Sequence, residues 1–137
     1  MIKPQNVAYQ LIKLCAPGTV TAAADKDASV VQYAGFIQNI FANCISGGTG
    51  ATSSIADVNL NGTTIFASAT KVTFAATTGT ATYGTFTTDP TQVAAGDVIS
   101  LDVDSVATSP KGFVVMVLIS KMNPAATTTL SNIDGVI

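Results

Sequence analysis

The chain has 137 residues, enough for one domain with a hydrophobic core, and it contains no histidine, tryptophan, arginine or glutamate. All eight acidic residues are Asp and all six basic residues are Lys, so the net charge is −2. This excludes a basic nucleic-acid surface, an arginine fork for phosphate and a histidine base or metal ligand, and we expect no enzyme and no cofactor.

The low charge content predicts association. Only 10% of the residues are charged, against about 25% in an average soluble domain. A surface with so few charges is poorly protected against contact with other chains. We expect a homo-oligomer in which part of the apolar surface is covered, although a large core beneath a Thr- and Ser-rich surface would also fit.

Residues 1–27 differ from the rest of the chain. They contain Pro4, Pro17 and an alanine run at 22–24, with one plausible short strand at 10–15. We interpret them as an N-terminal arm or a first strand. Residues 28–122 then form an antiparallel β-sandwich, and residues 123–137 form a C-terminal tail.

The N-terminal residues do not resemble a signal peptide. The run at 7–14 is short and interrupted by polar residues, and no apolar run approaches the roughly 20 residues of a membrane helix. We therefore expect synthesis in a cytoplasm and no membrane partner. Cys15 and Cys44 should then be buried, reduced thiols without a disulfide between them.

Residues 30–45 have two interpretations. Apolar residues recur at helical spacing, at Phe36, Ile37, Ile40, Phe41, Cys44 and Ile45. The segment is also rich in Val, Ile and Phe and contains Gly35, which favours a long strand or a bent strand pair buried on both faces, with a buried helix as the alternative. A glycine-rich stretch at 46–50 follows, and we predict a flexible loop there.

The next unit is a hairpin. Residues 55–60 alternate between apolar and polar side chains, and Asn61-Gly62 separates them from the apolar residues 63–66. Asn-Gly between two such runs is typical of a two-residue turn, because both positions need positive φ.

Further short strands are predicted at 71–74, 80–87, 98–106 and 112–120, with turns between them. The last strand is almost entirely apolar and should lie centrally in a sheet. Short strands separated by turns every eight to twelve residues indicate an all-β fold, an antiparallel β-sandwich or jelly roll.

Three carboxylates form a weak candidate metal site. Asp102 and Asp104 lie two residues apart on one strand face, with Asp97 nearby, as calcium ligands or a hydrolase carboxylate pair could. The simpler interpretation is that alternate Asp residues keep a strand face soluble. We expect no metal here. The tyrosines Tyr9, Tyr33 and Tyr83 could stack on sugars, but half-buried sheet tyrosines are the simpler interpretation.

Three stretches resemble a known family. They are DVNLNGTTIF at 57–66, VAAGDVISLDVDSV at 93–106 and KGFVVMVL at 111–118. Together they are similar to small β-sandwich modules of tailed-phage virions, found as capsid decoration (cement) proteins, head fibres and parts of tail fibres.

This resemblance implies a homotrimer on the outer capsid surface, with the major capsid protein as partner and residues 1–27 as the arm that touches the capsid. It implies no catalytic residue. The expected function is a non-enzymatic virion structural protein that stabilises or decorates a bacteriophage head. The alternative is a receptor- or glycan-binding module of a phage fibre, with a host surface glycan as partner.

Overall fold

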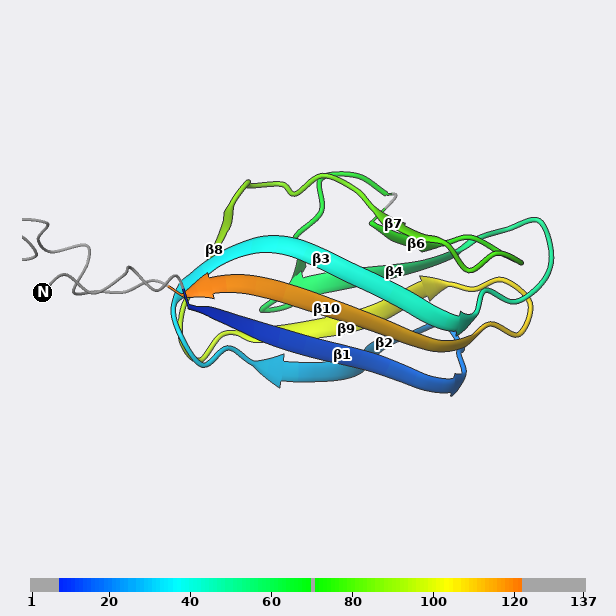
Figure 1. The fold of residues 1–137 in the computed structure, drawn as a ribbon, viewed down its shortest axis with the longest axis horizontal. Helices are drawn as coiled ribbons and strands as arrows, with labels where there is room; N and C mark the ends of the chain where they lie inside the picture. Colours follow the sequence, from blue (N-terminus) through cyan, green and yellow to red (C-terminus); the bar gives the residue numbers. More distant parts are fainter. Residues whose placement is uncertain (1–7, 70, 122–137) are drawn as a thin grey trace, which may run out of the picture.

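The computed structural model describes residues 8–69 and 71–121, and these fold into two stacked antiparallel sheets (Figure 1). Sheet A has the order β1 (Tyr9–Thr19), β10 (Lys111–Lys121), β3 (Gly35–Ser46) and β8 (Thr91–Val93). Sheet B has the order β2 (Ala23–Val30), β9 (Val98–Ser105), β4 (Ser54–Leu60), β6 (Val72–Phe74) and β7 (Ala81–Tyr83), with β5 (Thr63–Thr64) paired to β4. No helix able to cross a membrane occurs in the described residues.

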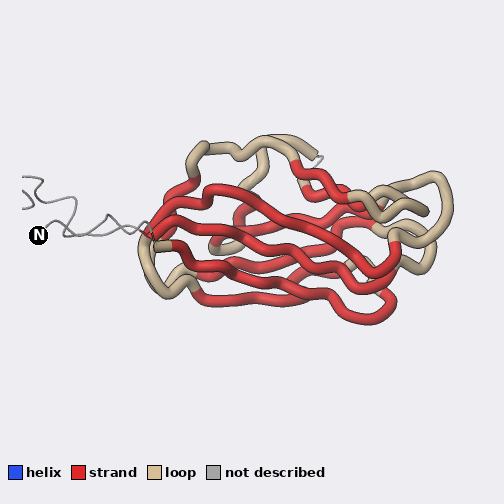
Figure 2. Tube along the Cα trace, viewed as in Figure 1, coloured by secondary structure: helices blue, strands red, loops and turns tan. Residues whose placement is uncertain are grey.

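The strand pairing is that of a jelly roll. The first strand pairs with the last, β2 with β9, and β3 with β8, all antiparallel. The chain therefore behaves as one long hairpin rolled up so that its paired strands alternate between two sheets. Figure 2 shows the strands running along the long axis, with loops at both ends. The predicted all-β sandwich is confirmed.

The core lies between the sheets and is built from alternate residues. On β10 the inward side chains Phe113, Val115, Val117 and Ile119 are fully buried. Phe113 stacks on Phe74 of β6 with ring centroids 4.2 Å apart, which ties sheet A to sheet B. Because β10 lies between β1 and β3, its predicted central position is confirmed.

The predicted hairpin is also confirmed. Asn61 and Gly62 have φ values of 50° and 85°, and Leu60 pairs with Thr63. The second strand is shorter than predicted, because β5 ends at Thr64. The Phe66 amide donates to the Thr64 hydroxyl at 3.2 Å, and the chain turns inward and buries Phe66.

The division at residue 27 is a correction. Residues 9–27 are not an arm, because β1 contributes Ile12, Leu14 and Ala16 to the core. The boundary between 27 and 28 falls inside β2, so the sandwich begins at β1, the first-strand alternative. The sequence hid β2 because its register shifts between Ala23 and Asp27, which removes the expected alternation. Residues 1–7 and the predicted tail at 123–137 lie outside the described residues.

Residues 35–46 form a strand, and their helical spacing has a local cause. Ile37 pairs with Ile119, while Leu118 pairs with Asn39, so one residue is inserted as a bulge. The bulge places Ile37 and Ile40, three residues apart, on the same inward face. A helical period in the sequence thus arises from an irregular strand. The prediction that this segment is buried on both faces is wrong, because Phe41 is 45% and Ile45 83% exposed.

Candidate functional site

The outer face of sheet A is a surface formed by β1, β10 and β3. Residues paired across these strands place their outward side chains next to one another, in rows that run across the face and are called ranks here. From one end to the other the ranks are Tyr9, Ser120 and Phe36; Leu11, Leu118 and Asn39; Lys13, Met116 and Phe41; and Cys15, Val114 and Asn43. On β10, the middle of the three strands, the outward positions in these ranks are occupied by three apolar side chains, Val114, Met116 and Leu118, and by Ser120.

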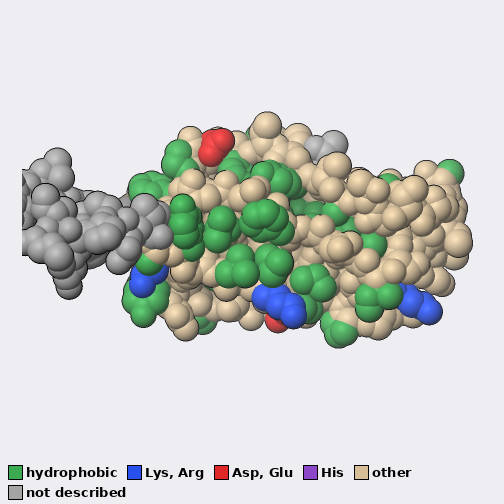
Figure 3. Space-filling view, in the orientation of Figure 1, with side chains coloured by type: hydrophobic (Ala, Val, Ile, Leu, Met, Phe, Trp, Pro, Cys, Tyr) green, Lys and Arg blue, Asp and Glu red, His purple; other side chains and the backbone are tan. Residues whose placement is uncertain are grey.

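This face is exposed. Leu11 is 53% exposed, Phe41 45% and Ile45 83%. Figure 3 shows hydrophobic side chains gathered over β1, β10 and β3, with lysines along the lower side and the ends. A continuous apolar patch rimmed by polar groups is typical of a contact surface, because its burial removes apolar area from water.

The strands of the two sheets differ in charge. The strands of sheet A contain Lys13, Lys111 and Lys121 and no Asp. The strands of sheet B contain Lys26 and five carboxylates, Asp25, Asp27, Asp57, Asp102 and Asp104. Asp27 accepts from the Cys15 amide at the edge of β1, so a partner of the sheet A face meets an apolar centre and a margin of lysines with one carboxylate beside them.

Phe41 stands between two hollows on the sheet A side. One, of about 230 Å³, is lined by Phe41, Ala42, Asn43, Val114 and Met116. The other, of about 450 Å³, lies between β3 and β7 and is lined by Phe41, Ala81 and Tyr83 among others. The aromatic ring is therefore a ridge with depressions on both sides.

The outer face of sheet B carries a bonded polar network. Asp57 and Asp102 are directly opposite each other on β4 and β9. Lys71 bridges Asp57 at 2.9 Å and Asp104 at 2.8 Å, and these hydrogen bonds raise the pKa of Lys71. Asn59 donates to Asp102 at 2.7 Å. Asp57 thereby has a cation beside it, whereas Asp102 is held by a neutral amide donor.

The three predicted metal candidates do not form one site. Asp102 accepts from Asn59 and from the Asp25 amide, and Asp104 pairs with Lys71. Asp97 lies in the turn before β9, where hydrogen bonds from the Ala94 amide and the Asn61 side chain lower its pKa. Within residues 8–69 and 71–121 no three Asp or Cys side chains are grouped to hold a metal ion.

The two cysteines are partly exposed, so the prediction that both are buried is wrong. Cys15 pairs with Val114 and belongs to the outer face, whereas Cys44 pairs with Phe113 and packs against the core. They lie on opposite faces of sheet A with β10 between them. Burial raises the pKa of the Cys44 thiol, which donates to the Gly79 carbonyl at 3.5 Å.

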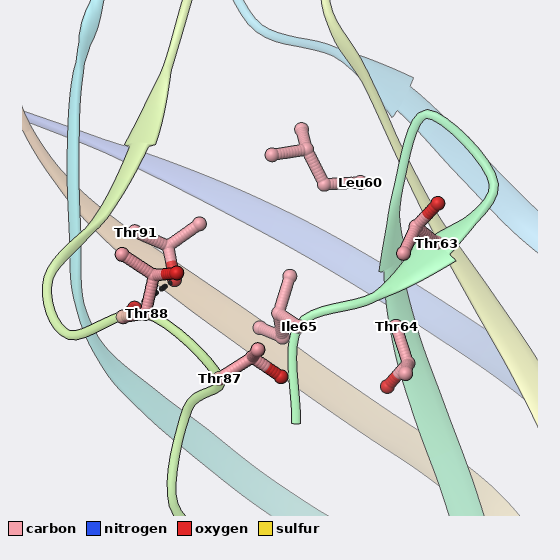
Figure 4. A pocket seen from close by; sticks show the side chains of 7 residues that line it. All are labelled: Leu60, Thr63, Thr64, Ile65, Thr87, Thr88 and Thr91. Atoms are coloured by element: carbon pink, nitrogen blue, oxygen red, sulfur yellow. Dashed lines mark hydrogen bonds between the residues drawn. The ribbon is translucent and has the colours of Figure 1, made fainter. Parts of the chain in front are cut away.

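A threonine-lined pocket opens beside the β4–β5 hairpin (Figure 4). Its volume is about 200 Å³, and Leu60 and Ile65 lie between the threonines of the hairpin and those near β8. Thr91 donates to the Thr88 carbonyl at 2.6 Å. The lining offers methyl and hydroxyl groups and no ionisable group, so it has no acid–base chemistry of its own.

Two of the three tyrosines share a groove, and the third lies elsewhere on the surface. Tyr9 and Tyr33 line a polar groove of about 290 Å³ between β1 and β2. Lys121 lies 3.8 Å from the ring centroid of Tyr33, and Gln10 donates to the Tyr33 carbonyl. Tyr83 donates a hydrogen bond to Asn39 and stacks on Phe86. The side chains of Tyr9, Tyr33 and Tyr83 are 55%, 49% and 44% exposed, so the prediction that they are half-buried is confirmed, although Tyr33 lies between β2 and β3 and not in a strand.

The glycine-rich loop at 46–50 is packed rather than a free linker. A side chain at Gly47 would lie 2.3 Å from the Ala75 carbonyl. Thr49 and Thr108 exchange two backbone hydrogen bonds, at 2.9 and 3.0 Å. Close backbone approach explains the glycine here, and the expectation of a flexible loop is wrong.

Sequence reasoning missed two parts of this surface chemistry. Lys71 was not singled out, and its role depends on a fold that brings β9 beside β4. The apolar outer face of sheet A was hidden because β10 is apolar on both sides, a pattern that indicates burial on both faces.

No protein-family model, no curated protein and no solved structure matches this chain.

Proposed function

We propose that the chain is a non-enzymatic structural protein of a tailed-phage virion, which binds the outside of the capsid and stabilises or decorates it. The observation that carries this proposal is the apolar, lysine-rimmed outer face of sheet A, which suits a protein that acts as an assembly of several copies on a repeating shell. Jelly rolls occur in viral capsid domains, in lectins and in cupins, so the fold by itself leaves the function open. The resemblance of residues 57–66, 93–106 and 111–118 to modules of tailed-phage virions supports the proposal of a capsid protein.

The proposed mechanism is thermodynamic. A protein that binds the assembled shell and not its separate subunits shifts the equilibrium toward the closed shell. Many copies on a repeating surface add their contributions through multivalency. The partner is the major capsid protein, and the chain is made in the host cytoplasm before it joins the virion.

A receptor- or glycan-binding module is the second candidate. The polar groove between β1 and β2 favours it, because two exposed tyrosines lie beside amide side chains. The argument for glycan binding is weaker than the argument for capsid decoration. Lys121 covers the ring of Tyr33, and both polar atoms of the Gln10 amide already have partners within the chain. We therefore place capsid decoration first.

Immunogold electron microscopy of purified virions tests the proposal. The label should lie on the outside of the heads in many copies, and heads from which the protein has been removed should release DNA at lower temperature. Re-addition of the protein should restore their heat resistance, and an unrelated jelly-roll protein serves as the control. Label confined to fibre tips, or absent from particles, would overturn the decoration proposal.

A further inference from the structure

We infer that the outer face of sheet A is the contact between copies of this chain, with the same face of another copy as its occupant. This goes beyond the proposed function because it requires no capsid. The starting observation is that Leu11 and Phe41, which strand pairing places on this face, are 53% and 45% exposed, and that hydrophobic side chains gather over β1, β10 and β3 (Figure 3). Single exposed apolar residues are ordinary, but ranks of them across three strands are not.

The face is large enough for a specific contact. Strands β1 and β10 have 11 residues each. With about 3.4 Å per residue and about 4.8 Å between strands, three strands cover roughly 500 Å². Two such faces bury roughly 1,000 Å² in total, the size at which specific interfaces begin.

The shape of the sheet A face is self-complementary, because a projecting side chain lies next to a hollow. Phe41 projects beside a hollow of about 230 Å³, which exists because Ala42 and Asn43 are small and flank Val114 and Met116. A closed symmetric assembly places the Phe41 ring of one copy in the hollow of the next, since projection and hollow lie side by side on the same surface. Aromatic and Met side chains are enriched at the centres of such contacts.

The buried carboxylates of sheet B argue against the alternative that the outer face of sheet B on a second copy covers the sheet A face. The outer face of sheet B presents Asp57 and Asn59, which are 4% and 6% exposed and bonded to their neighbours. Placing apolar side chains over this network would remove the remaining water from carboxylates at a cost in free energy. The sheet A face has neutral side chains in the ranks around β10, with Lys13 on the edge strand, from which its amine can extend to the rim.

The charges at the margin of the contact predict how association between copies responds to salt. The margin of the contact carries lysines and also a carboxylate, Asp27, whose Oδ2 accepts from the Cys15 amide on β1 at 2.8 Å, so the net charge interaction between two copies is weak and salt screens it. Association of like faces should therefore be unchanged or tighter in molar salt. An acidic partner surface would give the opposite response.

Sedimentation of the purified full chain over a concentration series tests the inference. Wild type should have the mass of a dimer at low and at molar salt, because contact between two like faces closes at two copies. Phe41→Thr and Leu11→Thr should each weaken association by roughly tenfold or more, because they remove large side chains from the centre of the contact. Val30→Thr is the matched control, since Val30 is 58% exposed on the edge strand of sheet B. Thermal melting checks that each variant is folded.

Cys15 supplies a second readout on the same face. In a Cys44→Ser background, maleimide should label Cys15 more slowly in the oligomer than in the Phe41→Thr variant at the same concentration. A monomeric wild type, oligomers that dissociate as salt rises, or equal labelling rates would overturn the inference. These measurements use no particles, so their failure is distinguishable from a failure of the capsid proposal.

Discussion

Asn61 and Asp97 join two turns that are 36 residues apart. The Asn61 amide Nδ2 donates to Oδ1 of Asp97 over 3.0 Å. The Asn61 Oδ1 accepts from the Val98 amide at 2.9 Å, and the other Asp97 oxygen accepts from the Ala94 amide at 2.8 Å. The β4–β5 turn is thereby fixed against the start of β9.

We predict that Asp97→Asn lowers the melting temperature by a few degrees at pH 7, because one charge-assisted acceptor is lost. The pKa of Asp97 is lowered in the folded state from its ordinary value of 3.8. Its contribution is therefore present above that pH and lost as pH falls through the lower folded value. Melting of both proteins between pH 2 and 7 should show their difference shrinking below about pH 4. A constant difference over this range would contradict the assignment.

We predict that Gly62→Val destabilises the protein by about 1 kcal/mol or more. Gly62 has φ of 85°, and a Cβ there meets no atom within 4 Å. The cost therefore comes from backbone strain and not from a clash. Gly62→Asn is the control, because Asn tolerates positive φ, and denaturant unfolding should rank wild type, Asn and Val in that order. Equal stability of the two variants would show that the backbone does not need this conformation.

The fold could be predicted where sequence signals are local. Asn61-Gly62 predicts a turn by itself, and the apolar run at 113–119 predicts a strand with neighbours on both sides in a sheet, because its side chains must be buried. The strand β2 could not be predicted, because Asp25 has φ of 50° and interrupts the alternation. Likewise β8 has three residues, too few to show a period.

The candidate contact surface depends on long-range pairing. The ranks that hold Leu11, Met116 and Phe41 join strands about 100 residues apart in the chain, and only the jelly-roll order brings them together. The composition predicted that apolar surface would be exposed, but not which face. The carboxylates at 102 and 104 were correctly assigned to one strand face, and their partners Asn59 and Lys71 could not be assigned without the sheet.

We predict that Lys71→Met destabilises the protein by about 1–3 kcal/mol, because it leaves a carboxylate without its cation. The Asp57 side chain is 6% exposed, whereas Asp104 is 40% exposed and contributes little to the pair. The pKa of Lys71 is raised above its ordinary 10.5, so its stabilisation is present below that pH and lost as pH rises through the higher folded value.

The control for this variant is Lys26→Met, since Lys26 donates to Thr21 on the exposed surface. Unfolding in urea should show a clear loss for Lys71→Met and little change for Lys26→Met. The wild type should lose stability above about pH 10.5, and Lys71→Met should lose less over the same range. Similar effects from both variants would mean that the bridge across β4 and β9 adds nothing measurable.

We predict that neither reductant nor chelator changes the melting temperature. Cys15 and Cys44 are separated by β10, and two strand spacings are about 10 Å, beyond the reach of a disulfide. Cys44 should react slowly with alkylating reagents at neutral pH, because burial raises its pKa and leaves little thiolate. A shift of several degrees with chelator would instead point to a metal on Asp97, Asp102 or Asp104.

We predict that Val115→Asp prevents folding. Val115 is 0% exposed at the centre of β10, and its side chain points between the sheets. An unpaired carboxylate there costs several kcal/mol, comparable with the roughly 5–15 kcal/mol that stabilises a whole domain. Val114→Asp is a matched control, because Val114 is the adjacent residue on the same strand and faces outward, half-buried. Circular dichroism and melting should show a folded Val114→Asp and an unfolded Val115→Asp, and a cooperative, wild-type-like melt for Val115→Asp would show that the core does not lie on this face of β10.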